Sequence, residues 1–296
     1  LAGATIAAHR QALQLARRWR RKDLMRKGKL FSVGWPRWRT LAAWLFVATA
    51  CGAKKDIVDR DRALVEALAP EGHKLESLTG ELADGVRALR DGELEEAKAA
   101  LERYQEKHPG SAMAAYHLGL CALQADQPTL AQNQFQRAVD NDPKLHAALC
   151  HLGALYLAQG EDVAALRVLD QAFALAPDDV RVLANLGAAR ARRGLWSEAL
   201  EAYQAANKIA PSHGTLLYDT ALVWMLRQQW QPALELLEQA LTIRPFFGQA
   251  WAAKVACLHG LGELVAAEAA AQEGLDTVPL PEAELHLAYA RVLVHQ

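Results

Sequence analysis

The stretch HAALCHLGALYLAQGEDVAALRVLDQAFALAP, residues 146–177, decides the fold. Apolar residues recur at helical spacing on both sides of Gly160, so the stretch predicts two helices. The glycine supplies a left-handed turn at the end of the first helix. Pro177 ends the second, because proline has no N–H and disfavours helix in the residue before it. The stretch therefore predicts a helical hairpin.

The same hairpin recurs along the chain with a period of 34 residues. Six of the eleven prolines follow one another at this spacing: Pro109, Pro143, Pro177, Pro211, Pro245 and Pro279. An alanine lies twelve residues before each of them: Ala97, Ala131, Ala165, Ala199, Ala233 and Ala267. Seventeen residues before each lies Gly92, Asp126, Gly160, Gly194, Gln228 or Gly262. A repeat of this length indicates a stacked array, and not the two globular domains that the chain length alone would suggest.

A small residue is also expected where the two helices of each unit cross. Twenty-four residues before the prolines lie Gly85, Gly119, Gly153, Gly187, Ala221 and Val255. Two helices that pack closely need a missing side chain at their crossing point. These positions and the repeated alanines are therefore predicted to face each other.

The pattern resembles the tetratricopeptide repeat (TPR) family, whose units have 34 residues. The third unit carries the family's signature at Leu149, Leu152, Gly153, Tyr156, Ala165, Leu169 and Pro177. The resemblance implies an all-α fold, a right-handed α-solenoid of six helix-turn-helix units with a C-terminal capping helix. The expected units are 78–111, 112–145, 146–179, 180–213, 214–247 and 248–281, followed by the capping helix at 282–296.

The N-terminal part of the chain has a different character. Residues 1–50 carry a net charge of +10, and the remainder is acidic. Within 25–50 a basic segment precedes ten apolar residues and small residues, which is the order of a secretory signal. Ten residues are too few to span a bilayer as a helix. Ala48–Cys51 resembles a bacterial lipobox, so Cys51 is the expected lipidation site.

Three further expectations concern this end of the chain. Residues 51–77 are polar and out of phase with the repeat, so we expect a lipidated tether. Residues 1–24 precede Met25, the natural start of the signal, and we expect them to have no role. Gly52 stands where an aspartate favours the inner membrane in enterobacterial lipoproteins, which favours the periplasmic face of the outer membrane. If the signal is accidental, the chain is cytoplasmic.

The resemblance implies a concave groove that receives a protein or peptide partner, with no cofactor, metal or small-molecule substrate. The sequence contains none of the common catalytic motifs, and no cysteine–histidine pairs with the spacing of metal ligands. The acidic body disfavours nucleic acid. The groove residues are expected on the first helix of units two to five, and in units two, three and five this helix is apolar on both faces. They are Met113, Tyr116, His117, Leu120, Leu123, Cys150, His151, Leu157, Arg181, Asn185, Tyr218, Asp219, Leu222 and Met225.

Three hypotheses about function remain open. Six repeats behind a lipidated cysteine resemble the pilotins, which help to install the secretin of the type IV pilus, and this favours a membrane-tethered, non-catalytic adaptor of the bacterial envelope. A second hypothesis is the TPR module of a glycosyltransferase-type system such as the O-GlcNAc transferases, which requires a catalytic domain or subunit. A third is a cytosolic TPR scaffold.

Overall fold

The structure is a computed structural model, and it describes residues 80–279 and 283–295. These residues form thirteen α-helices, and no strand occurs among them. The expected all-α fold is confirmed. The predicted signal, Cys51 and the tether lie outside the described residues.

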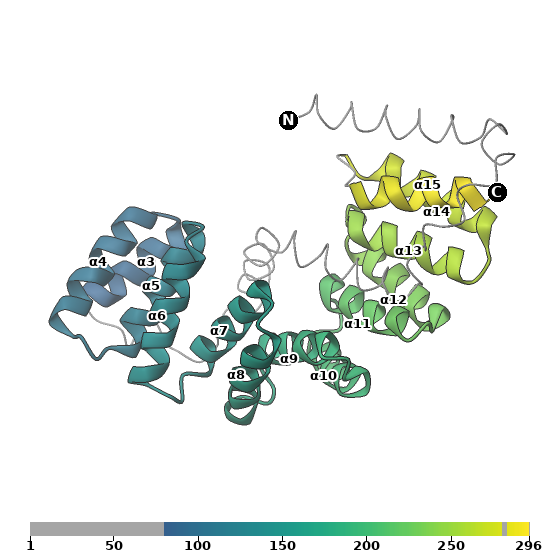
Figure 1. Ribbon diagram of the computed structural model, residues 1–296. Coiled ribbons are helices and arrows are strands. Elements are labelled where there is room, and N and C mark those ends of the chain that lie inside the picture. The colour runs from purple at the N-terminus through teal and green to yellow at the C-terminus, as the bar shows by residue number, and fades with distance from the viewer. Residues whose placement is uncertain (1–79, 280–282, 296) are drawn as a thin grey trace, which may run out of the picture. The chain divides into compact units, whose positions relative to one another are not determined.

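The described helices fall into two compact units. The N-terminal unit ends at Ile209, and within it each hairpin packs against the next through its second helix. Its helices are α3 (Glu81–Asp91), α4 (Leu94–Lys107), α5 (Ala112–Gln124), α6 (Pro128–Asn141), α7 (His146–Gln159), α8 (Asp162–Leu175), α9 (Val180–Arg192) and α10 (Trp196–Ile209) (Figure 1).

The C-terminal unit begins at Ala210 and is stacked in the same way. Two hairpins follow one another, and the last helix packs against both helices of the second hairpin. The helices are α11 (Gly214–Leu226), α12 (Trp230–Ile243), α13 (Gly248–Gly260), α14 (Leu264–Thr277) and α15 (Ala283–His295). None of the described helices is long and apolar enough to span a membrane.

The helix crossings are as tight as the sequence predicts. All six repeated alanines have no exposed surface. A methyl group added to Gly119 would lie 2.6 Å from Phe135 Cε1, and one added to Gly153 would lie 2.5 Å from Leu169 Cγ. Both distances are shorter than van der Waals contact, so a larger side chain would have to push the helices apart. The small residues thus set how closely the two helices of a hairpin approach.

The turns inside the hairpins share one backbone geometry. All six residues that lie seventeen positions before the prolines have positive φ, including the non-glycines Asp126 (53°) and Gln228 (59°). At Gly160, the N–H of the glycine is bonded to the Leu157 carbonyl and that of Glu161 to the Tyr156 carbonyl. This pair of bonds is the Schellman motif, which satisfies carbonyls at a helix end. Each second helix then ends two residues before its proline.

Gln228 and Asp126 hold this left-handed conformation without the freedom of glycine. For a residue with a Cβ, the conformation costs about 1–2 kcal/mol. We expect Gln228→Gly to raise the free energy of unfolding by about 0.5–1 kcal/mol, because part of this gain is offset by a more flexible unfolded chain. Urea unfolding measures the change. Gly160→Ala, the opposite change at an equivalent turn, should lower the stability. A loss of stability in Gln228→Gly would contradict the argument.

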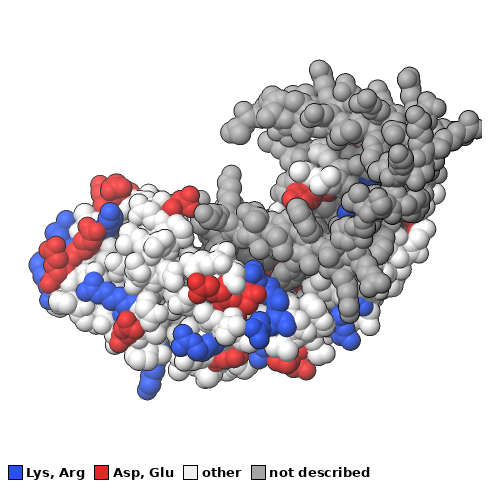
Figure 2. Space-filling model, in the orientation of Figure 1, with Lys and Arg blue, Asp and Glu red and all other residues white. Residues whose placement is uncertain are grey.

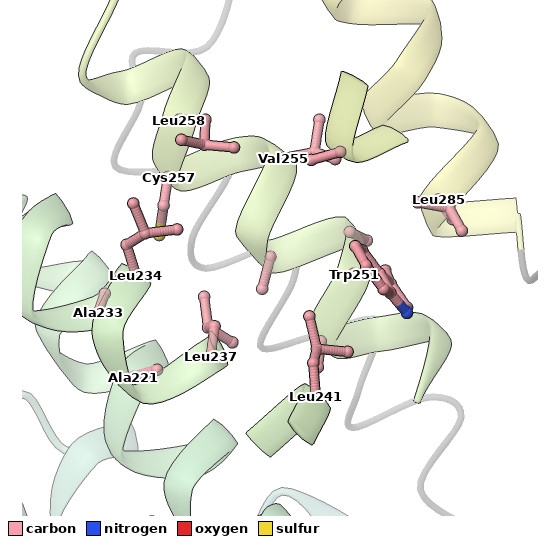
Figure 3. Packing of buried hydrophobic residues seen from close by; sticks show 14 of the residues in the cluster. Ala221, Ala233, Leu234, Leu237, Leu241, Trp251, Val255, Cys257, Leu258 and Leu285 are labelled. Atoms are coloured by element: carbon pink, nitrogen blue, oxygen red, sulfur yellow. The ribbon is translucent and has the colours of Figure 1, made fainter. Parts of the chain in front are cut away.

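The core of the C-terminal unit joins its hairpins to the last helix. Leu234, Leu237 and Leu241 of α12 lie beside Trp251 and Leu258 of α13 in one buried cluster (Figure 3). Leu285 of α15 belongs to the same cluster and has no exposed surface. Apolar burial contributes roughly 25 cal/mol per Å². The last helix is therefore held by the same apolar contacts as the hairpins.

Candidate functional site

The predicted groove residues all lie on first helices of hairpins. We call the fourteen of them the predicted groove face. Five are on α5, three on α7, two on α9 and four on α11. Within each helix their spacings are those of neighbours on a helical surface, which places them on one side.

The predicted groove face is more buried than its apolar composition alone indicates. Nine of the fourteen residues of α7 are buried, as are ten of the thirteen of α11. The eight buried members of the face are Cys150, His151, Leu157, Arg181, Tyr218, Asp219, Leu222 and Met225. The six half-buried members are Met113, Tyr116, His117, Leu120, Leu123 and Asn185. The accessible part of the face is therefore concentrated on α5.

Aromatic rings connect three helices of the N-terminal unit at this face. The His151 ring of α7 stacks on Phe135 of α6, with centroids 5.0 Å apart and planes 10° apart. Tyr116 of α5 lies 5.7 Å from His151 and 5.8 Å from Phe135. Aromatic pairs at such distances stabilise packing beyond their buried area. The half-buried Tyr116 ring is therefore held by Phe135 of its own hairpin and by His151 of the next hairpin.

In the repeat pattern of the sequence, four polar members of the predicted groove face share one column: His117, His151, Asn185 and Asp219. Beside this column, the Asn185 amide of α9 donates to Cys150 Sγ of α7 at 3.4 Å. In the described part of the chain, no group of three or more His, Cys, Asp or Glu residues is placed to hold a metal ion.

Arg181 is a buried cation at the beginning of α9. Its Nη2 and Nε donate to the Asp179 carboxylate at 2.8 and 3.2 Å, and Asp179 also caps the helix by accepting from the Arg181 backbone N–H. Burial by itself raises the pKa of the Asp179 carboxyl, but the Arg181 hydrogen bond and charge outweigh it and lower that pKa. His146 Nε2 of α7 lies 3.6 Å from the same carboxylate. Asp179 therefore links α9 to the preceding hairpin.

The buried cysteines have no nucleophilic character. Burial raises the pKa of Cys121 to about 11 and that of Cys257 to about 12. Both thiols are protonated at neutral pH, and the thiolate is the reactive form. The two side chains pack in apolar clusters.

Charge does not single out a binding face on the N-terminal unit. In Figure 2 acidic and basic side chains alternate over its visible surface, without one sign gathering in a single field. Some charged side chains of the N-terminal unit form ion pairs, for example Lys107 with Glu81 and Arg192 with Asp162. A partner of this visible face is therefore not chosen by gross charge.

Sequence reasoning did not find the Asp179–Arg181 pair or the role of Phe135. The position of Asp179 directly before a helix is an N-cap signal, and that signal could have identified half of the pair. Phe135 lies on a second helix, where the search for groove residues did not extend. Its stacking on His151 depends on how two hairpins pack, which no local pattern contains.

The comparisons with known proteins agree with this architecture. A family model for the tetratricopeptide repeat matches residues 82–146, 122–172 and 156–214. PilF of Pseudomonas aeruginosa is 18% identical with a TM-score of 0.61, over 73% of this chain and 96% of that one. YrrB, a TPR protein with an unusual peptide-binding site, is 23% identical with a TM-score of 0.52, over 65% and 97%. A thermophilic TPR protein of Thermus thermophilus is 22% identical with a TM-score of 0.51, over 62% and 99%.

No significant match was found among curated proteins. At these identities the solved structures show the shared fold alone. The family-model match covers the first four hairpins, and the buried alanines and left-handed turns recur in the last two. The chain therefore carries tetratricopeptide repeats over residues 82–214, within an all-α fold that its solved relatives share.

Proposed function

We propose that this protein is a membrane-tethered adaptor of the bacterial envelope that binds a protein partner on its predicted groove face and assists the assembly of an envelope complex. The observation that carries the proposal is the accessible apolar and aromatic surface of α5. Met113, Tyr116, Leu120 and Leu123 are half-buried on a helix whose other side is fully packed. A solvated helix face is ordinarily polar, so an apolar one indicates a partner.

The pilotin-like role is the finer part of the proposal. Its support is the lipobox-like Cys51 in the sequence together with the fold shared with PilF. TPR solenoids present extended surfaces for peptides, and YrrB has a peptide-binding site. A pilotin needs both parts, a lipid that holds it at the membrane and a surface that holds its client.

The anchor is tested by metabolic labelling with radioactive palmitate. We expect label on the wild-type protein and none on Cys51→Ser, because the thiol of Cys51 is the acceptor. Cys121→Ser is the matched control and should keep the label, since that thiol is buried in the folded repeats. Labelled Cys51→Ser, or unlabelled wild type, would refute the lipid anchor.

The binding face is tested by a double change on α5. We expect Tyr116→Ala with Leu120→Asp to abolish co-purification of the partner from detergent-solubilised envelopes, because it removes the aromatic surface and places a charge on it. Val163→Asp on α8 is the control: its side chain is 66% exposed and lies on a second helix. Far-UV circular dichroism verifies that both variants stay helical. Unchanged capture by the α5 variant would refute the assignment of the face.

A further inference from the structure

The last helix leaves an apolar stripe uncovered. On α15, Leu285 and Val292 have no exposed surface and hold the helix against α13 and α14. Leu287 and Val294 of the same helix are 65% and 52% exposed. These two residues lie seven positions apart, which is two helical turns, so they share one side of the helix. A terminal helix of a repeat array usually turns a polar side to water.

This stripe lies in the same register as the predicted groove face. Leu287 follows Asp219 of α11 by two repeat periods, and Val294 follows Leu226 by the same interval. Between them, α13 carries the small Ala253 and Gly260 at the corresponding positions. Because α15 packs on α14 as each first helix packs on the second helix before it elsewhere in the array, it continues the series of first helices by one. The capping helix α15 thus occupies the place of the first helix of a seventh hairpin.

The surroundings of the stripe are predominantly acidic. Residues 255–290 contain no lysine or arginine, and Arg291 is the one such residue on α14 and α15. The described part of 255–290 carries five carboxylates: Glu263, Glu268, Glu273, Asp276 and Glu284. Glu284 precedes Leu287 by one helical turn, and α14, which holds three of the others, packs along α15. Arg291 lies one turn from both Leu287 and Val294, so the stripe contains one cation, but the five carboxylates leave the balance of charge negative. A predominantly negative surface favours partners of the opposite sign.

We infer that Leu287 and Val294 bind an amphipathic helical segment of the protein partner, with apolar residues facing α15 and lysine or arginine residues facing the carboxylates. The inference rests on the proposed function, since it names the chemistry of the partner's contact on the C-terminal unit. An anionic lipid surface is disfavoured by the same carboxylates. A second copy is disfavoured because the two acidic surfaces would repel each other.

The test uses the full chain and two synthetic helical peptides, one of leucine and lysine and one of leucine and glutamate with the same spacing. In fluorescence anisotropy at physiological salt we expect only the lysine peptide to bind. The double substitution Leu287→Ser with Val294→Ser should weaken the affinity for the lysine peptide by about tenfold, which corresponds to about 1.4 kcal/mol. Val265→Ser, at an 81% exposed valine of α14, is the matched control and should bind as the wild type does.

Equal binding of both peptides, or undiminished binding by the α15 variant, would overturn the inference. Light scattering of the same samples provides a second outcome: a wild-type dimer that the α15 variant converts to a monomer would assign the stripe to a second copy and refute the basic partner. The α5 variant separates this result from the proposed function. If that variant loses the native partner while the α15 variant keeps it, only the inference about α15 fails.

Discussion

Ala165→Leu is expected to lower the free energy of unfolding by about 3 kcal/mol, near the upper end of the cost of overpacking. Ala165 has no exposed surface and packs among Leu157, Leu169 and Leu186. Its neighbour in the crossing is Gly153, where even a methyl group would overlap Leu169. The extra carbons of leucine at this point must separate α7 from α8 or force side chains out of their rotamers.

The matched control is Ala174→Leu on the same helix. Ala174 is exposed, so the substitution adds the same atoms without meeting a neighbour, and its effect should stay within about 0.5 kcal/mol. Urea unfolding followed by circular dichroism gives both values. Equal effects of the two substitutions would mean that the crossing is not as tight as the structure shows.

Asp179→Ala should be the second large effect, with a loss of about 3 kcal/mol. The change removes the carboxylate that pairs with Arg181, whose side chain is 9% exposed, and it removes the N-cap of α9. A buried cation without its partner carries an uncompensated desolvation cost. Asp179→Asn should cost less, since an amide oxygen can still cap the helix. A loss below about 0.5 kcal/mol for Asp179→Ala, a typical surface value, would show that Arg181 is solvated.

The same pair predicts a pH dependence. Because the pKa of Asp179 is lowered in the folded protein, its ionic stabilisation is complete above the ordinary aspartate value of about 3.9 and is lost as the pH falls through the folded value. The stability difference between wild type and Asp179→Asn should therefore be constant between about pH 5 and 7 and shrink below about pH 4. A difference that persists unchanged to lower pH would contradict the ionic origin.

Much of the fold could be predicted because the same pattern of turn and crossing residues occurs in six successive units. The left-handed turn is an example: Asp126 and Gln228 lack the conformational freedom of glycine, yet their register placed them at turns, and both have positive φ. The buried alanines were predictable for the same reason, since every unit needs the same close crossing. A lone hairpin would have given much weaker grounds for either inference.

The candidate site was less predictable, because burial depends on what packs against a helix. Tyr116 and Tyr218 occupy equivalent positions in the second and fifth units, yet Tyr116 is half-buried and Tyr218 is 3% exposed beside Phe247 at a ring distance of 4.8 Å. The apolar pattern of a helix does not distinguish a side chain packed on a neighbouring unit from one that awaits a partner. The sequence analysis did not single out Leu287, because it looked for groove residues only on the first helices of units two to five.

The fold connects these observations to function through rigidity. The crossings and Schellman turns fix each hairpin, and the ring stack at His151 and the Asp179 contacts join neighbouring hairpins of the N-terminal unit. A surface held in place before binding loses less conformational entropy when a partner docks. The adaptor role that we propose depends on such a surface.

Site-specific photo-crosslinking in the native envelope tests the central claim most directly. A photoreactive phenylalanine analogue replaces Tyr116 on α5 in one strain and Val163 on α8 in another. The account predicts a crosslinked adduct with a discrete envelope protein from position 116 and none from position 163. Adducts from position 163 with no adduct from position 116 would place the partner on the other side of the repeats and contradict the account.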